Sequence, residues 1–376
     1  MRIVIKLMEF LLNLIYLLIK IITPVREKIT FISRQGNAPS LDFQLLSEEL
    51  TDRGICTVVL CKILDKSVAG LFSYGFHMIK QMWHMAGSKV VILDGYCIAA
   101  SMLKHKKSLT IVQSWHSMGS MKDFGYTAMG KEEGSSYKLA KAMKMHQNYD
   151  YVLISSEAYK MDMAAGFRCD ENKIYVRPLP RLDLLTSDSY EKQECAKIYR
   201  KYPELKEKKN ILYCPTFRKG DESGLKQALE DLVCAVDKQK YNLIVKLHPL
   251  SELALKESQV CQAKEFTTFD MLFVADYVIS DYSCVVYEAA VRGIPLYFLA
   301  FDLELYEGNR GLAIDYEKEC PGLISERAEE IIREIEEGSY DRRALKQFAD
   351  KYVQPTEHAT ADMADFILGV MNGRVE

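Results

Sequence analysis

The sequence predicts an α/β protein with two facing, doubly wound (Rossmann-like) domains and an amphipathic helix at its N-terminus. A chain of 376 residues is long for one hydrophobic core but suits two domains. Beyond the first 24 residues, short apolar runs alternate with longer amphipathic stretches, which is the pattern of parallel strands joined by helices. The runs form two series along the chain, so we expect two sheets.

Residues 1–24 predict a membrane-associating helix. The stretch is nearly continuous in apolar residues, and its polar residues lie within roughly 60° of one another around a helix. They are Arg2, Lys6, Glu9, Asn13 and Lys20. Such a stripe suits a helix in the membrane interface, where it stays among the headgroups while the other faces enter the acyl chains. A helix packed on the protein or a dimer partner, and a transmembrane span, remain alternatives.

Residues 25–185 predict the first α/β domain. Its expected strands are solid apolar runs without alternation, as in central strands that helices cover on both faces. The runs are Lys28–Ser33, Cys56–Leu60, Lys89–Asp94, Leu109–Gln113 and Asp150–Ser155.

Residues 186–376 predict the second domain. Its expected strands are Asn210–Cys214, Asn242–Leu247, Asp276–Ser280 and Pro295–Leu299. The connector lies in Pro178–Glu207, where a ProLeuPro step precedes a charged helix expected over Tyr190–Lys209. The amphipathic helical stretch from Arg342 onward is a candidate to pack back on the first domain.

Composition argues against two classes of function. The net charge of −3 disfavours a nucleic-acid binder that depends on overall charge. Ten cysteines are scattered from Cys56 to Cys320 without a CxxC pair, which indicates reduced thiols in a reducing compartment and no metal site. No acidic pair requires a divalent cation, so Mg²⁺ is allowed but not implied.

Ligands bind doubly wound sheets beyond the carboxyl ends of the strands, and polar motifs follow the predicted strands there. In the first domain the segment Gln113–Gly119 (QSWHSMG) leaves a strand and places Trp115 and His116 at the rim of the expected cleft. Histidine exchanges protons near neutral pH, which suits a catalytic base. A histidine held by backbone groups in a turn is the alternative.

The segment Lys246–Pro249 follows a strand of the second domain. Lys246 and His248 point to the same side of an extended segment, and Pro249 keeps His248 out of the next helix. A lysine and a histidine at this edge suit a phosphate. A structural histidine before a turn is the alternative.

The segment Ser280–Ala290 joins a strand to an expected helix. Asp281 and Ser283 flank the helix start, whose free N–H groups favour an anion, and Glu288 lies about two turns along. A simple serine N-cap is the alternative.

Two guanidinium groups complete the polar set of the second domain. In Tyr213–Arg218, Pro215 ends a strand and delivers Thr216 and Arg218 to the same edge. Arginine binds paired phosphate oxygens through two parallel hydrogen bonds, and Arg310 could add a second guanidinium. Together these motifs are suited to a diphosphate.

In their order and spacing, these motifs resemble the CDP-glycerol glycerophosphotransferase family, the primases and polymerases of teichoic acid synthesis. The resemblance covers about Lys28–Gly322 and is most specific over Asp276–Gly322. PTFR, KLHP and the QxWH element stand in the family's order. The resemblance implies a GT-B-like fold whose C-terminal domain binds the CDP-activated donor and whose N-terminal domain faces the acceptor.

By this resemblance, His116 and His248 correspond to two essential histidines. The implied donor or phosphate-binding residues are Thr216, Arg218, Lys246, Ser280, Asp281, Ser283, Cys284, Glu288, Arg310 and Gly311. The implied acceptor-side residues are Trp115, Ser117, Gly119 and Lys122. The chain has Ser117 and Met118 where the family often has GlyThr, and Cys284 where it has serine, so the identities of polyol and acceptor stay open.

The expected reaction is attack by a hydroxyl of a lipid-linked acceptor on the β-phosphorus of CDP-glycerol or a similar CDP-polyol, with release of CMP. His116 would act as the base, and His248 would contact the diphosphate or the departing CMP. No cofactor beyond the donor is expected. The protein would lie on the cytoplasmic face of the cell membrane as a peripheral, monotopic enzyme, with a homo-oligomer allowed. A nucleotide-sugar glycosyltransferase or epimerase, and a catalytically silent membrane-surface scaffold, are the alternatives.

Overall fold

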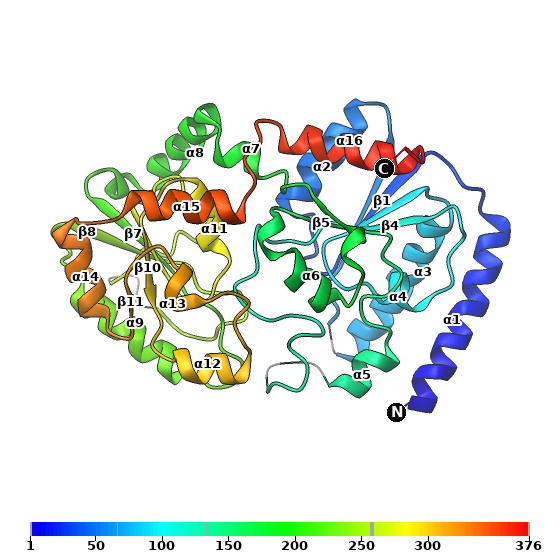
Figure 1. Ribbon diagram of the computed structural model, residues 1–376, viewed down its shortest axis with the longest axis horizontal. Coiled ribbons are helices and arrows are strands. Elements are labelled where there is room, and N and C mark those ends of the chain that lie inside the picture. Colours follow the sequence, from blue (N-terminus) through cyan, green and yellow to red (C-terminus); the bar gives the residue numbers. More distant parts are fainter. Residues whose placement is uncertain (1, 66, 133, 135, 256–258, 375–376) are drawn as a thin grey trace.

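Two parallel sheets lie side by side in the computed structural model, which describes residues 2–65, 67–132, 134, 136–255 and 259–374 (Figure 1). The six-stranded sheet has the order β2-β1-β3-β4-β5-β6, and the five-stranded sheet has the order β11-β10-β9-β7-β8. Neighbouring strands run parallel in both sheets. The prediction of an α/β fold with two doubly wound sheets is confirmed.

The first sheet follows the predicted runs closely. Its strands are β1 (Lys28–Ser33), β2 (Cys56–Cys61), β3 (Val90–Leu93), β4 (Thr110–Gln113), β5 (Tyr151–Ile154) and β6 (Ile174–Val176). Its helices are α2 (Leu41–Asp52), α3 (Val68–Ala86), α4 (Ile98–Met102), α5 (Tyr137–Ala142) and α6 (Lys160–Phe167). The sequence did not predict β6, because this edge strand has only three residues and no extended apolar run.

The second sheet shows the same agreement. Its strands are β7 (Lys209–Cys214), β8 (Tyr241–Val245), β9 (Tyr277–Ser280), β10 (Leu296–Leu299) and β11 (Ile324–Ser325). Its helices are α9 (Ser223–Ala235), α10 (Thr268–Met271), α11 (Val285–Val291), α12 (Leu303–Asn309), α13 (Tyr316–Glu319) and α14 (Ala328–Glu337). The two-residue strand β11 was not predicted, since so short a segment carries no periodic signal.

Between the sheets the chain forms α7 (Leu182–Leu185) and α8 (Asp188–Lys201). The predicted charged helix over Tyr190–Lys209 is wrong at its C-terminal end. Pro203 disfavours helical geometry at Tyr202, which has φ −128° and ψ 73°. A short 3₁₀ turn, Pro203–Lys206, follows, and Lys209 already begins β7.

The last two helices connect the two halves of the molecule. α15 (Arg342–Tyr352) packs on α11, and α16 (Ala359–Met371) packs on α2 beside the first sheet (Figure 1). The carboxylate of Asp183 accepts hydrogen bonds from the first backbone N–H groups of α16, at Ala359 (2.6 Å) and Thr360 (2.9 Å). The chain therefore crosses between the sheets twice, once before α8 and once after α15.

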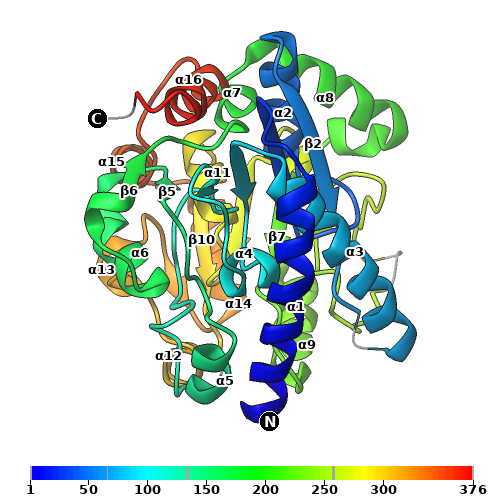
Figure 2. The same cartoon turned by 90° about the vertical axis from the view of Figure 1, so that its right-hand side faces the viewer.

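The N-terminal helix α1 (Arg2–Ile22) lies along α3 on the outside of the first half (Figure 2). Three of its polar residues contact the protein and do not face the surroundings. Glu9 forms an ion pair with Lys144 (2.7 Å), the side-chain oxygen of Asn13 accepts from the backbone N–H of Lys104 (2.9 Å), and Lys20 donates to the carbonyl of Lys104 (2.6 Å). The prediction that these three residues stay among lipid headgroups is therefore wrong. Their alignment in one stripe serves to dock the helix.

The other residues of the predicted stripe do not join this docking face. Lys6 is exposed, and the side chain of Arg2 lies outside the described part of the structure. Tyr16 is completely buried and its hydroxyl lies 3.1 Å from Nδ1 of His105, so α1 also contributes to the core of the first half.

Large apolar side chains cover the outer face of α1 and continue onto α3. On α1 they include Leu7, Phe10, Leu14, Leu18 and Ile21, and on α3 they include Val68, Leu71, Phe72, Phe76 and Trp83. Among the helices that the structure describes, none is long and apolar enough to cross a membrane.

Candidate active site

His116 lies just beyond the carboxyl end of β4, as the sequence predicts. The side-chain oxygen of Gln113 accepts from the backbone N–H of Trp115 (3.0 Å), which stabilises the sharp turn at the strand end. Trp115 has a positive φ of 60°, a strained conformation for a large residue. Its indole ring is held by Phe124 and Phe167, at centroid distances of 4.6 and 5.2 Å. Trp115 is therefore an anchor that fixes the backbone on which His116 is carried.

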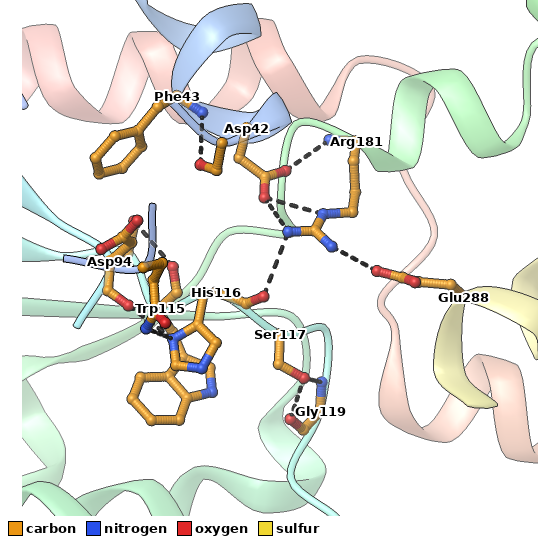
Figure 3. A network of polar contacts seen from close by, with 12 residues as sticks. Asp42, Phe43, Asp94, Trp115, His116, Ser117, Gly119, Arg181 and Glu288 are labelled. Atoms are coloured by element: carbon orange, nitrogen blue, oxygen red, sulfur yellow. Dashed lines mark hydrogen bonds and ion pairs between the residues drawn. The ribbon is translucent and has the colours of Figure 1, made fainter. Parts of the chain in front are cut away.

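The imidazole of His116 has a defined orientation (Figure 3). Nδ1 lies 2.7 Å from the backbone carbonyl of Asp94, at the end of β3. Because a carbonyl only accepts, Nδ1 donates and the neutral ring carries its lone pair on Nε2. Burial lowers the pKa of His116 and the charge of Arg181 lowers it further, although the bond to the Asp94 carbonyl opposes both. The ring is therefore suited to accept a proton at Nε2 at neutral pH.

An ion network that the sequence did not predict lies next to the backbone of His116 (Figure 3). Arg181, in the connector, donates from Nε to the carboxylate of Asp42 on α2 (2.9 Å) and from Nη1 to Glu288 on α11 (2.6 Å). Nη2 contacts Asp42 again and reaches the backbone carbonyl of His116 (3.3 Å). No local pattern marks Arg181, because its partners are 139 and 107 residues away along the chain.

Glu288 was predicted to bind the donor, and its carboxylate instead pairs with Arg181. Burial raises the pKa of Glu288, and the neighbouring guanidinium of Arg181 opposes this shift. The side chain therefore joins the second half of the molecule to the connector in this structure, and its role in donor binding stays a prediction.

The segment after His116 passes from the first half onto the second. The Ser117 hydroxyl donates to the Gly119 carbonyl (2.7 Å), which closes a tight turn. A Cβ on Gly119 would lie 2.4 Å from the ring of Tyr287 on α11, so only glycine permits this approach. Lys122 then forms an antiparallel β-bridge with Leu312. The predicted acceptor-side residues thus lie at the junction between the halves, against the predicted donor side.

Gly311 lies on the other side of the same junction. Its φ is +84°, and its carbonyl accepts from the backbone N–H of Asp123 (3.1 Å). A Cβ there would overlap the Asp123–Lys131 ion pair, so Gly311 is needed for close contact between the halves. Neighbouring Arg310 is half-buried at the end of α12.

Arg218 and Asp281 face each other in a buried ion cluster. The Arg218 guanidinium donates to Asp281 (2.9 Å) and through two nitrogens to Asp302 (2.7 and 2.9 Å). It also donates to the carbonyl of Thr216 (2.7 Å), whose own N–H donates to Asp281 (2.8 Å). Four N–H bonds of Arg218 are thus directed at protein oxygens. In this structure the nearby carboxylates bind the guanidinium, and its contact with a diphosphate stays a prediction.

Two further predicted phosphate contacts also have protein partners. The three donors of Lys246 point at the backbone carbonyls of Gln262, Ala263 and Phe266, at 3.1, 3.0 and 2.6 Å. The hydroxyl of Ser280 donates to the carbonyl of Cys214 on the adjacent strand (2.7 Å). Both side chains thus stabilise the second sheet in this structure, and their contacts with a phosphate stay predictions.

The helix start in the third motif also differs from the prediction. α11 begins at Val285 and has seven residues, and Cys284 is its N-cap without a side-chain capping bond. The thiol of Cys284 lies 3.7 Å from the carbonyl of Gly119, across the junction. Ser283 is half-buried and does not cap the helix. Cys284 therefore contributes to the junction through packing.

His248 lies on the exposed rim beyond β8. Its ring stacks on Phe217 at a centroid distance of 5.4 Å, and Nδ1 accepts from the backbone N–H of Leu250 (3.2 Å). The neutral ring therefore carries its proton on Nε2, the opposite tautomer to His116. Partial burial lowers the pKa of His248, and the charge of Lys122 lowers it further.

Lys122 connects the two histidines electrostatically. Its charge contributes to the lowered pKa of both His116 and His248, after burial as the main cause in each case. The structure thus brings together His116, His248, Lys122 and Arg310 near the carboxyl ends of both sheets. In the part of the chain that the structure describes, no three histidine, cysteine or acidic residues are grouped as metal ligands would be.

Comparison with known proteins places the chain in a family. Residues 15–364 match the family described as CDP-glycerol:poly(glycerophosphate) glycerophosphotransferase. The chain belongs to this family. The match spans both sheets, the connector and both histidine motifs.

Among curated relatives, the chain is 29% identical over 366 residues to a teichoic acid ribitol-phosphate primase of Bacillus spizizenii, covering 94% of each chain. It is also 29% identical over 297 residues to a teichoic acid glycerol-phosphate primase of Bacillus subtilis, covering 77% of this chain and 76% of the relative. Members of the family thus include proteins named for either polyol.

Solved structures agree on the fold. The wall teichoic acid polymerase TagF aligns with a TM-score of 0.76 at 18% identity, over 100% of this chain and 98% of that one. A UDP-GlcNAc 2-epimerase from Neisseria meningitidis aligns with a TM-score of 0.57 at 14% identity, over 91% and 99% of the two chains. The likeness to TagF supports the GT-B-like arrangement of two parallel sheets that the resemblance implied.

Proposed function

We propose that this protein transfers a polyol-phosphate group from a CDP-activated polyol to a hydroxyl of a lipid-linked, teichoic-acid-type acceptor and releases CMP. Family membership supports the reaction class, and the names of the relatives, which include ribitol-phosphate and glycerol-phosphate primases, support a CDP-polyol donor. The donor would bind beyond the second sheet and the acceptor would approach from the first.

The orientation of His116 carries this proposal. The 2.7 Å hydrogen bond from Nδ1 to the Asp94 carbonyl leaves Nε2 as the proton acceptor. Burial keeps the ring neutral by lowering its pKa. His248 comes from the other half of the molecule, and Lys122 lies within electrostatic reach of both rings. With His116 as the base in one half and His248 as a phosphate contact in the other, the site suits transfer of a polyol phosphate between ligands bound to the two halves.

The proposed step is a direct displacement at phosphorus. The acceptor oxygen forms a bond to the β-phosphorus of the donor, and the bond from that phosphorus to the bridging oxygen breaks. The electron pair of the broken bond stays on the α-phosphate of the departing CMP. His116 takes the hydroxyl proton at Nε2, and Nε2–H of His248 donates a hydrogen bond to the diphosphate or to CMP.

The test is CMP release by the full-length protein with CDP-glycerol and CDP-ribitol, across a short panel of lipid-linked acceptors. We expect acceptor-dependent CMP release with at least one donor, because both polyols occur among the relatives. A parallel binding panel should include UDP, since epimerases share this fold. Binding of UDP in preference to CDP would favour a nucleotide-sugar enzyme, and failure to bind any nucleotide would favour a scaffold.

We also propose that the protein is attached to the cytoplasmic face of the cell membrane through the outer face of α1. Leu11 and Leu18 are 48% and 60% exposed on this face, and exposed apolar side chains continue on the adjacent α3. An apolar face of this extent is unusual on a protein that only meets water. It suits a helix that lies in the interface of a bilayer, where a lipid-linked acceptor would be reached.

A further inference from the structure

Lys122 belongs to the first half of the chain but is held against the second. Its backbone pairs with Leu312, and the flanking residues add two hydrogen bonds, from Asp123 N–H to Gly311 and from Ala313 N–H to Met121, each 3.1 Å long. Gly119, which lies three residues before Lys122, is packed against Tyr287 of the second half. The backbone of Lys122 is therefore fixed relative to the carboxyl edge of the second sheet.

The charges around the ammonium group define its surroundings. Asp281 and Cys284 raise the pKa of Lys122, whereas the positive charges of Arg310 and Arg218 lower it. The largest effect on the pKa of Lys122 is burial, which lowers it. Asp281 does not pair with Lys122, because its carboxylate is bound to Arg218 at 2.9 Å. The ammonium group is thus partly desolvated beside two guanidinium groups.

The other cations predicted to meet a phosphate help to identify the role of Lys122. Lys246 is directed at three carbonyls, and Arg218 is directed at two carboxylates. For Lys122, the structure shows no hydrogen bond or ion pair of the ammonium group with any residue it describes. A partly buried charge without a counter-ion is costly, and an anionic ligand would offset that cost.

We infer that Lys122 is a catalytic residue that binds the diphosphate of the donor and stabilises the negative charge that develops on the departing CMP. The inference rests on the proposed function and reassigns Lys122 from the acceptor to the donor. The charge of Lys122 acts on both His116 and His248. It can therefore neutralise the diphosphate as the bond from the β-phosphorus to the bridging oxygen breaks. Both halves of the molecule would then contribute directly to donor binding.

The test compares full-length Lys122→Met and Lys122→Arg with Lys226→Met, a control at an exposed lysine on α9. Calorimetry with CDP and UDP gives affinity, and CMP release gives kcat and KM. We expect Lys122→Met to weaken nucleoside diphosphate binding by about tenfold to a hundredfold, with a larger loss in kcat/KM. Lys122→Arg should recover part of both losses, and Lys226→Met should change neither.

The outcomes separate the two proposals. If the wild type prefers UDP to CDP, the proposal of a CDP-polyol donor is overturned. If UDP binding is then lost in Lys122→Met, the role of Lys122 in binding the diphosphate is still supported. Unchanged nucleotide affinity and kcat/KM in a folded Lys122→Met variant would overturn the role of Lys122 alone. If Lys122→Met fails to fold, the same comparison is made between two other variants. A higher affinity in the charge-retaining Lys122→Arg than in Lys122→Gln supports the inference, and equal affinities in these two variants overturn it.

Discussion

His116 and His248 are held in opposite tautomers. His116 donates from Nδ1 to the carbonyl of Asp94, while Nδ1 of His248 accepts from the N–H of Leu250. The first ring therefore offers an acceptor at Nε2, and the second offers a donor. Because Nε2 accepts in one ring and donates in the other, the two histidines can have different roles in one site. Kinetic measurements on variants of each histidine can distinguish these roles.

We expect the two alanine variants to fail in different ways. His116→Ala should keep near-normal CDP affinity while kcat falls by about a hundredfold to ten-thousandfold, because only the proton acceptor is lost. His248→Ala should weaken CDP binding as well as turnover, because its contact to the diphosphate exists already in the bound donor. Calorimetry and CMP release measure both quantities. CDP affinity lost only in His116→Ala would reverse the roles.

Asp94 provides a prediction about stability and pH. Its side chain is 2% exposed, and burial raises the pKa of the carboxyl to about 6, although the Ser33 hydroxyl partly opposes this. The unfolded chain has the ordinary value of about 3.9, so the folded protein holds this proton more tightly. Asp94 therefore lowers the free energy of unfolding as the pH rises from about 4 through about 6.

Asp94→Asn should remove this dependence. Relative to the wild type, the free energy of unfolding of the variant should increase by about 2 kcal/mol between pH 4 and pH 7. Urea unfolding at several pH values measures this difference, and the titrations of other groups cancel in the comparison. Parallel stability curves would show that the carboxyl of Asp94 titrates at its ordinary pKa.

Single residues also mark the limit of what the sequence can predict about the site. His116 and His248 could be located, because each directly follows an apolar strand. The partners of Arg218, Lys246 and Glu288 could not be predicted, since they lie elsewhere along the chain. Residue type indicated a cation or a carboxylate at the right edge of the sheet, but only the fold determines which neighbour neutralises it.

At the scale of elements, the sequence predicted the strands better than the faces of the helices. Nine apolar runs correspond to β1–β5 and β7–β10, because buried parallel strands need solid apolar runs. The sequence shows the polar stripe of α1, but three of its residues contact the protein and not lipid headgroups as predicted. A stripe shows that one face meets polar groups, and both a lipid headgroup and a backbone carbonyl satisfy that requirement.

The docking of α1 determines how its membrane attachment should be tested. Deleting the helix would remove Tyr16 from the core, so loss of binding after a deletion would be ambiguous. Leu11→Glu with Leu18→Glu changes only the outer face. We expect this variant to stay folded and to lose binding to anionic vesicles, because two carboxylates would have to enter the acyl region.

The matched control places the same charges at exposed apolar residues away from α1. Leu305 on α12 and Met161 on α6 are 63% and 72% exposed. Leu305→Glu with Met161→Glu should sediment with vesicles like the wild type. If the α1 variant also sediments normally, the apolar residues of α3 or another surface must carry the attachment.

At the scale of the whole molecule, the junction between the halves depends on the ion network of Arg181. The side chains of Arg181, Asp42 and Glu288 are 17%, 8% and 11% exposed, so all three charges are largely removed from water. Asp42 belongs to the first half and Glu288 to the second. The guanidinium is therefore the link that both halves need, and it contacts the carbonyl of His116 as well.

Replacing Arg181 by methionine should affect both stability and turnover. Two buried carboxylates would lose their counter-charge, and breaking such pairs typically costs about 3–5 kcal/mol. Glu288→Gln should cost less, because it removes one charge and keeps a hydrogen-bonding group. Thermal or urea unfolding of the two variants measures this order.

The double variant Arg181→Met with Glu288→Gln shows whether the two residues act as a link between the halves. If they do, the second change should cost little once the first is made, and the unfolding energies should be non-additive by more than about 0.5 kcal/mol. In Glu288→Gln, CDP affinity should stay near normal, because the proposed donor contacts lie elsewhere. The kcat of this variant should fall, because the two halves no longer hold His116 in position against the donor. Additive unfolding energies together with unchanged kcat would show that Arg181 and Glu288 stabilise their own halves independently, and that the position of His116 relative to the donor does not depend on this ion pair.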